Sequence, residues 1–120
     1  TDVCVPISLL AECVDQTLAE AEAEGLPYFV VGHVGDGNFH VGFLIVDEAE
    51  REQAQALSDR MVQRALRLDG SCSGEHGIGL HKQAYLLQEA GEPALAAMRA
   101  IKAALDPHGV MNPGKVFAAS

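Results

Sequence analysis

The sequence contains no tryptophan, and aromatic side chains of any kind make up only 5% of its 120 residues. Basic side chains are also few: 8 Lys and Arg stand against 17 Asp and Glu, which gives a net charge of −9. Because nucleic-acid binding depends on Lys and Arg that contact phosphates, this balance argues against a nucleic-acid partner. No apolar run approaches the roughly 20 residues that a membrane-spanning helix requires, so we expect no membrane span.

Cysteine is too sparse for a disulfide framework. The three residues Cys4, Cys13 and Cys72 form an odd number, and no CxxC pair occurs. This usage favours a reducing compartment, and we expect a cytoplasmic protein, with peripheral attachment to the inner membrane as the alternative. The most familiar catalytic motifs are missing as well. HExxH, GxSxG and GxGxxG are all absent, so the usual metalloprotease, serine hydrolase and dinucleotide-binding signals do not apply.

Hydrophobic periodicity predicts an α+β fold in a single domain that spans residues 1–120. The predicted strands cover residues 2–6, 28–34 and 39–46, and the predicted helices cover 8–24, 47–70, 82–90 and 93–105. With a last strand in the segment 71–79, the order β-α-β-β-α-β is that of a ferredoxin-like sandwich, an antiparallel sheet with helices packed on it. Since the strand 39–46 is apolar on both sides, we expect covering layers on both faces of the hairpin.

The ends of the first two predicted helices carry helix-capping signals. Ser8 is the predicted N-cap of the helix 8–24. Asp47 and Glu50 match a capping box at the start of the second helix. The last turns of that helix contain three arginines, which complement the helix dipole: Arg60, Arg64 and Arg67.

Two short segments concentrate the polar chemistry, GHVGDGNFH at 32–40 and SGEHGIG at 73–79. In a hairpin with the four-residue loop 35–38, His33 faces His40, with Cβ atoms about 4.5–5.5 Å apart. Both imidazoles then point to one face and could bind one metal, and Glu75 from a neighbouring strand would complete a His-His-Glu site with an open position. The alternative is a polar cross-strand histidine pair without a metal.

Glu75 and His76 are adjacent, and successive side chains of a strand point to opposite faces. This favours Glu75 as a ligand and His76 as a base directed elsewhere. The glycines at 74, 77 and 79 indicate backbone that a ligand or another segment approaches closely. The alternative for this segment is a tight turn with a surface histidine.

Three ordered segments, the two above and LDPHGVMNPGKVF at 105–117, resemble the C-terminal domain of FAD-linked oxidases, in the branch of cytochrome-type D-lactate dehydrogenases and glycolate oxidase FAD subunits. The resemblance implies that residues 1–120 form a substrate-side cap domain, and that an N-terminal FAD-binding domain of the same protein is absent from this sequence. It implies His33, His40 and Glu75 as ligands of a divalent metal, zinc or manganese. It also implies His76 as the catalytic base, and Gly77, Gly79 and Asn112 as FAD-binding positions.

The reaction implied by the resemblance is oxidation of a D-2-hydroxy acid, D-lactate to pyruvate being favoured, with hydride transfer to the flavin and a cytochrome or quinone as electron acceptor. Some relatives carry Asn where this chain has Gly42, which favours a small acid over a dicarboxylate. We expect the 120 residues alone to be inactive, and to self-associate through the apolar faces of the hairpin.

Two other classes of function remain open from the residues. One is a self-contained metal-dependent hydrolase or lyase that uses the same histidines and glutamate without flavin. The other is a non-catalytic ferredoxin-like module for metal binding or protein interaction.

Overall fold

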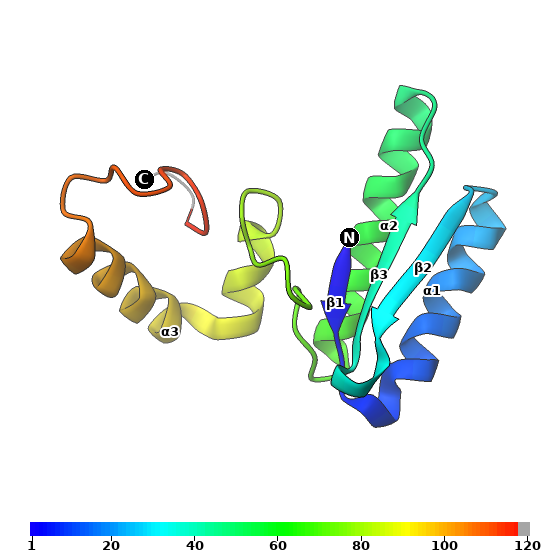
Figure 1. Ribbon diagram of the computed structural model, residues 1–120, viewed down its shortest axis with the longest axis horizontal. Helices are drawn as coiled ribbons and strands as arrows, with labels where there is room; N and C mark the ends of the chain where they lie inside the picture. Colours follow the sequence, from blue (N-terminus) through cyan, green and yellow to red (C-terminus); the bar gives the residue numbers. More distant parts are fainter. Residues whose placement is uncertain (118–120) are drawn as a thin grey trace. The chain divides into compact units, whose positions relative to one another are not determined.

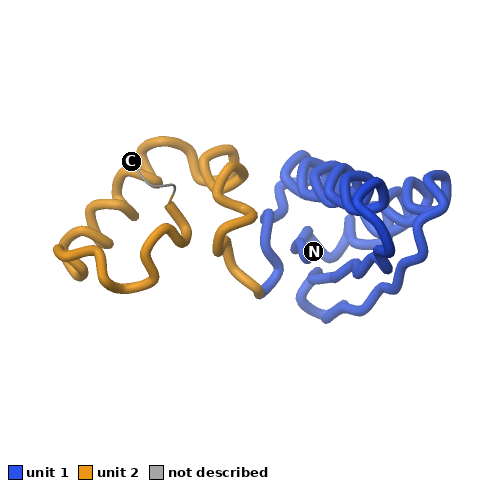
Figure 2. Tube along the Cα trace, turned by 90° about the horizontal axis from the view of Figure 1, so that it is seen from above, with its two compact units in different colours: residues 1–75 blue, residues 76–120 orange. Residues whose placement is uncertain are grey.

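The computed structural model describes residues 1–117, and it divides the chain into two compact units between Glu75 and His76 (Figure 2). The first unit contains the sheet and two helices. The second contains one long, broken helix and the loops that flank it. The predicted α+β class is confirmed.

The first unit is a three-stranded antiparallel sheet in the order β1-β3-β2, with two helices on one face (Figure 1). Its elements are β1 (Asp2–Cys4), α1 (Leu10–Glu24), β2 (Tyr28–His33), β3 (Asn38–Phe43) and α2 (Glu48–Arg67). On the helix side, Val3, Phe39 and Val41 are at most 3% exposed and join the helices in the core. The side chains of the alternate residues therefore lie on the open face of the sheet.

The position of a fourth strand is taken by a single residue pair. Ser71 pairs antiparallel with Cys4, on the edge of β1 that β3 does not occupy. The sheet thus keeps the ferredoxin-like order. The expected last strand in 71–79 does not form beyond this pair, because the chain bends immediately after Ser71.

The hairpin differs from the prediction in its loop. A 3-10 turn, η2 (Val34–Asp36), and Gly37 connect the strands, so the closing pair is His33 with Asn38. Gly37 has φ +71°, and a Cβ there would lie 2.0 Å from the carbonyl oxygen of Val5. Its left-handed conformation and this close approach fix the loop one residue earlier than predicted. The predicted pairing of His33 with His40 is therefore wrong.

The starts of the two helices show one wrong prediction and one confirmed prediction. Ser8 is not an N-cap, because a 3-10 turn, η1 (Ile7–Leu9), precedes α1 and no side chain caps it. In α2 the predicted cap is present: the Asp47 carboxylate accepts a hydrogen bond from the backbone N–H of Glu50 at 2.9 Å. The Glu50 carboxylate accepts one in return from the N–H of Val46.

Only one face of the hairpin is covered within Thr1–Glu75. On the open face, Phe29 is 54% exposed and Val31 is 56% exposed. The predicted second covering layer is therefore absent from this unit. Leu44–Val46 were also assigned to a strand, but β3 ends at Phe43 and all three of these residues are exposed.

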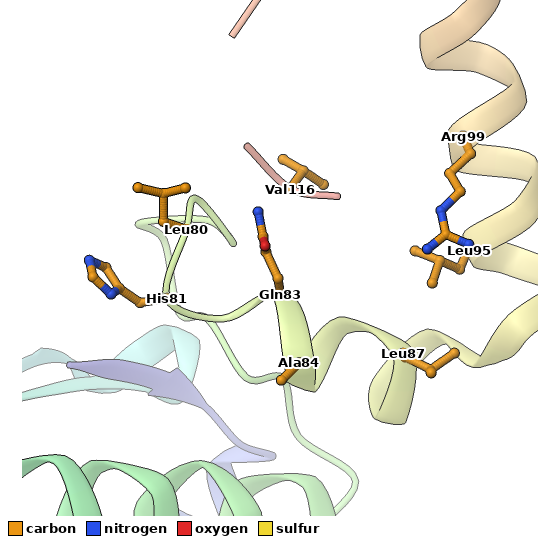
Figure 3. A pocket seen from close by; sticks show the side chains of 8 residues that line it. All are labelled: Leu80, His81, Gln83, Ala84, Leu87, Leu95, Arg99 and Val116. Carbon is orange, nitrogen blue, oxygen red and sulfur yellow. The ribbon is translucent and has the colours of Figure 1, made fainter. Parts of the chain in front are cut away.

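The second unit is built on α3 (Gln83–Leu105), which breaks at Gly91 with φ 75° and ψ 161°. Pro93 follows the break, so the two predicted helices are confirmed as the two segments of α3. A cavity of about 450 Å³ lies beside α3, lined mainly by apolar side chains including Leu87 and Leu95 (Figure 3). Among residues 1–117, no helix has the length and apolar character needed to cross a membrane.

Candidate metal centre

His33 and His40 lie on the open face of the sheet, as predicted, but not directly opposite each other. His40 pairs with Val31, and His33 is two residues further along β2. His40 thus pairs with a residue two positions before the predicted partner. Because side chains alternate with period two, both imidazoles still lie on the same face of the sheet. Their ring centroids are 6.3 Å apart, in an edge-to-face arrangement at 81°.

Glu75 joins the two histidines. Its Oε1 atom lies 2.9 Å from Nε2 of His40 and 3.6 Å from Nε2 of His33. One ligand atom from each of the three residues lies within 4.8 Å of the others. The His40 side chain is 13% exposed, whereas those of His33 and Glu75 are 62% and 47% exposed. Two imidazoles and one carboxylate are a donor set that suits zinc or manganese, and the exposed side leaves room for a further ligand.

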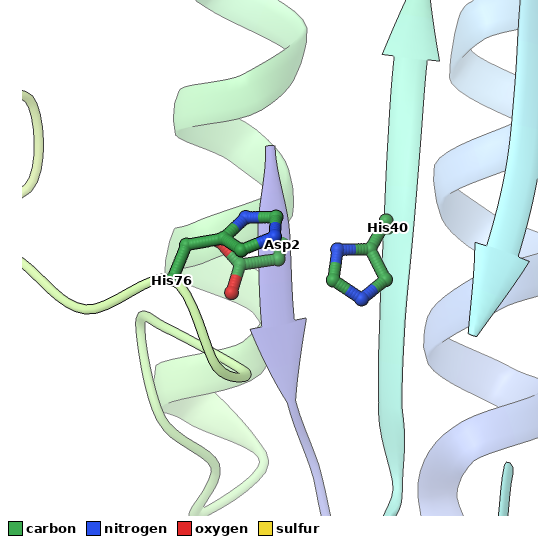
Figure 4. Close-up of side chains that lie close together, drawn as sticks. All are labelled: Asp2, His40 and His76. Atoms are coloured by element: carbon green, nitrogen blue, oxygen red, sulfur yellow. The ribbon is translucent and has the colours of Figure 1, made fainter. Parts of the chain in front are cut away.

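Glu75 does not lie on a strand, although a position on a neighbouring strand was predicted. The Asp2 carboxylate accepts hydrogen bonds from the backbone N–H of Glu75 at 2.9 Å and from the Ser73 hydroxyl at 3.3 Å. Asp2 and His40 are strand partners on β1 and β3, and Figure 4 shows their side chains. The segment 73–75 is therefore attached to β1 through a side chain rather than through a backbone ladder.

Gly74 fits against the buried side chain of Asn38. A Cβ at position 74 would lie 2.0 Å from Oδ1 of Asn38, so the close approach requires glycine there. Asn38 is on the open face of β3, two residues from His40, and is 5% exposed. This confirms the prediction of a close backbone approach for Gly74.

Sequence reasoning missed Asp2 and Asn38. For Asp2, one signal was available: a carboxylate inside the otherwise apolar strand-like run at the start of the sequence. For Asn38, the loop assignment concealed its role, because a loop asparagine is ordinarily explained by turn chemistry.

The remaining predicted site residues lie in the second unit. His76 follows Glu75 directly in the chain, and its side chain is exposed. Gly77 and Gly79 have φ values of 75° and 52°, with open space where a Cβ would be. Asn112 also has a positive φ, 47°, and is exposed. Backbone conformation alone accounts for glycine at 77 and 79, so their role toward FAD stays a prediction.

An apolar side chain lies on the same open face of the sheet as the two histidines. Gly42 follows His40 by two residues and pairs with Phe29 across the hairpin. A Cβ at position 42 would lie 2.2 Å from Cζ of Phe29, so the ring occupies the space that a side chain at 42 would need. Phe29 thus forms an apolar wall on the same face as His40.

Comparison with known proteins identifies the family. The model of the FAD linked oxidases, C-terminal domain, matches residues 1–116. The chain is 48% identical to a mitochondrial D-lactate dehydrogenase [cytochrome] from Kluyveromyces lactis over 98% of this chain and 20% of that protein. It is 47% identical to the corresponding protein from Arabidopsis thaliana, over 98% of this chain and 21% of the relative. With glycolate oxidase subunit GlcD from Bacillus subtilis it shares 35% identity, over 98% of this chain and 25% of the relative.

These matches extend over nearly the whole chain, which spans about a fifth to a quarter of the length of the three relatives. All three sequence segments that carried the resemblance lie almost entirely inside the matched residues 1–116. The chain therefore belongs to the family of C-terminal domains of FAD-linked oxidases.

Proposed function

We propose that this chain is the substrate-side domain of an FAD-dependent dehydrogenase that oxidises a D-2-hydroxy acid, with D-lactate as the preferred substrate and pyruvate as the product. The observation that carries the proposal is the His33–His40–Glu75 cluster on the open face of the sheet. It occurs in a chain 48% identical to a cytochrome-type D-lactate dehydrogenase. Because the chain spans a fifth of that relative, we place the FAD-binding domain in another part of the complete protein.

The three clustered side chains would hold a divalent metal, zinc or manganese. When bound, the metal would supply a Lewis acid that polarises the substrate hydroxyl and lowers its pKa. The distance of 2.9 Å between Oε1 of Glu75 and Nε2 of His40 supports this assignment, since two atoms this close together can bind the same ion. The larger exposure of His33 leaves the substrate side of the cluster accessible.

The proton of the substrate hydroxyl would pass to His76. An imidazole is the usual general base near neutral pH, and His76 adjoins the ligand Glu75 in the chain. FAD, when bound, would supply the acceptor for the hydride from C2, and its redox chemistry belongs to the cofactor. Gly77, Gly79 and Asn112 would contribute backbone at positive φ on the flavin side of the site.

The preference for a small acid rests on Phe29. Its ring fills the space beside Gly42, on the same face as His40, with an apolar surface. A methyl group such as that of lactate can pack against this wall, whereas a second carboxylate would lose hydration without gaining a partner from it.

The proposed electron acceptor is a cytochrome or a quinone, since several relatives are named as cytochrome-type enzymes. Those relatives are also named as mitochondrial, and we propose that the complete protein acts at the periphery of an inner membrane. Membership of an FAD-linked family favours this reading over a self-contained hydrolase, a lyase or a non-catalytic module.

The test uses the complete protein, purified without chelator or nickel, and the variants His40→Ala, His76→Ala and His81→Ala. His81 is an exposed imidazole outside the cluster and serves as the control. We expect near-stoichiometric zinc or manganese in the wild type and His81→Ala, and its loss in His40→Ala. D-lactate should reduce the flavin at least about 100-fold more slowly in His40→Ala and His76→Ala. Wild-type protein without metal, or unchanged flavin reduction in both variants, would refute the proposal.

A further inference from the structure

Asp2 is a buried carboxylate on an edge strand of the sheet. Its exposure is 1%, and it lies on the same face as His40, its strand partner (Figure 4). Burying a carboxylate is unfavourable unless hydrogen bonds compensate for the water that it loses. The hydrogen bonds that the Asp2 carboxylate accepts therefore explain how it can be buried.

Those bonds extend the pairing of β1 beyond the point where its backbone ladder stops. Ser71 pairs with Cys4 through two backbone hydrogen bonds, of 2.7 and 3.2 Å. Continued antiparallel pairing would bring Ser73 opposite Asp2. Instead of backbone groups, Oδ2 of Asp2 accepts from the Ser73 hydroxyl and from the N–H of Glu75.

The second of these bonds fixes the backbone of a residue whose side chain reaches the histidines. The N–H of Glu75 is held at 2.9 Å by Asp2, while Oε1 of Glu75 lies 2.9 Å from Nε2 of His40. A bond to a charged acceptor is about twice as strong as a neutral one, so a carboxylate suits this task better than an amide. Without it, Glu75 would sit in a stretch of bends with no ladder to hold it.

We infer that Asp2 is a positioning residue for the proposed metal centre: by accepting hydrogen bonds from the Ser73 hydroxyl and from the backbone N–H of Glu75, it places the Glu75 carboxylate beside His33 and His40. The inference rests on the proposed function, since it assigns Asp2 to the same site. Groups that orient metal ligands in this way typically change metal affinity by 10–100-fold when they are removed.

The experiment measures Zn²⁺ affinity by competition titration in the complete protein, after removal of resident metal. The variants are Asp2→Ala, Asp2→Asn and Glu75→Ala. The control is Thr17→Val, which alters an equally buried polar residue, 1% exposed, on α1. Amide hydrogen exchange of Glu75 in the metal-free protein is the second readout, because it reports the bond to Asp2 without depending on metal.

We expect Asp2→Ala to weaken Zn²⁺ binding by about 10–100-fold and to speed exchange of the Glu75 amide. Asp2→Asn keeps an oxygen acceptor, so it should bind Zn²⁺ more tightly than Asp2→Ala and less tightly than the wild type. If Asp2→Ala does not fold, Asp2→Asn is the variant that tests the inference. Thr17→Val should bind Zn²⁺ as the wild type does.

Two results would overturn the inference in distinguishable ways. If Asp2→Ala and Asp2→Asn bind Zn²⁺ as tightly as the wild type, or lose no more affinity than Thr17→Val, Asp2 has no positioning role and the proposed centre stands. If the wild type binds no Zn²⁺, or Glu75→Ala binds it equally well, the centre itself is refuted, and the role of Asp2 falls with it.

Discussion

At the scale of single residues, Arg64 stands out as a buried cation in α2. Its side chain is 6% exposed and donates to the Thr17 hydroxyl at 2.7 Å, to the side-chain oxygen of Gln16 at 3.1 Å, and to the Glu20 carboxylate. The sequence had assigned Arg64 a different role, as one of three arginines in the last turns of a helix that complement its dipole. The structure shows in addition that it ties α2 to α1.

We predict that Arg64→Ala lowers the free energy of unfolding by about 2–3 kcal/mol, because several charge-assisted hydrogen bonds are lost from a buried position. Arg51→Ala is the matched control. Arg51 bonds to Glu48 on the surface of the same helix, where both side chains are at least 66% exposed. This control should cost less than about 0.5 kcal/mol. Urea denaturation monitored by circular dichroism measures both, and equal losses in the two variants would contradict the prediction.

At the scale of elements, the end of α3 depends on one carboxylate. Asp106 accepts hydrogen bonds at 2.9 Å from the backbone N–H groups of Val110 and Met111, and it binds the Lys102 ammonium. The Lys102 ammonium, helped by these two N–H groups, holds the pKa of Asp106 below its ordinary value. Asp106 thereby closes the loop that leads to Asn112.

The pH dependence of unfolding should reveal this carboxylate. A lowered pKa in the folded state means that Asp106 contributes stability above its unfolded pKa of roughly 4, and that this contribution is lost as the pH falls through the folded value. The melting temperature of Asp106→Asn should therefore lie below that of the wild type by a constant amount between pH 7 and about pH 5. The difference should shrink below about pH 4. A difference that does not change with pH would show that charge plays no part.

The hairpin shows how far an element can be predicted from this sequence. The alternation of side chains along the strands predicted that His33 and His40 lie on one face. The prediction holds although the pairing differs by two residues, because side chains alternate with period two. The loop itself was not predictable, since the close approach of Gly37 to Val5 involves the residue after β1, which is distant in sequence. Glu75 was found from its motif. Its support by Asp2 was not, because a buried carboxylate gives no local signal of its partner.

At the scale of the whole molecule, the last prediction concerns self-association through the open face of the sheet. Phe29 and Val31 expose more than half of their surface on the face that also bears His33 and His40. Exposed apolar side chains that lie together mark a surface that binds another surface. We therefore predict that residues 1–120, produced alone, associate reversibly as their concentration rises.

Light scattering across a hundredfold range of concentration tests this prediction. Val31→Ser should move the association to higher concentration, because it removes apolar area from the open face. Ile101→Ser is the control, since Ile101 is 61% exposed but lies on α3 in the second unit. It should leave the association as it is. A monomer at every concentration, or an equal response to both substitutions, would show that the open face does not drive association.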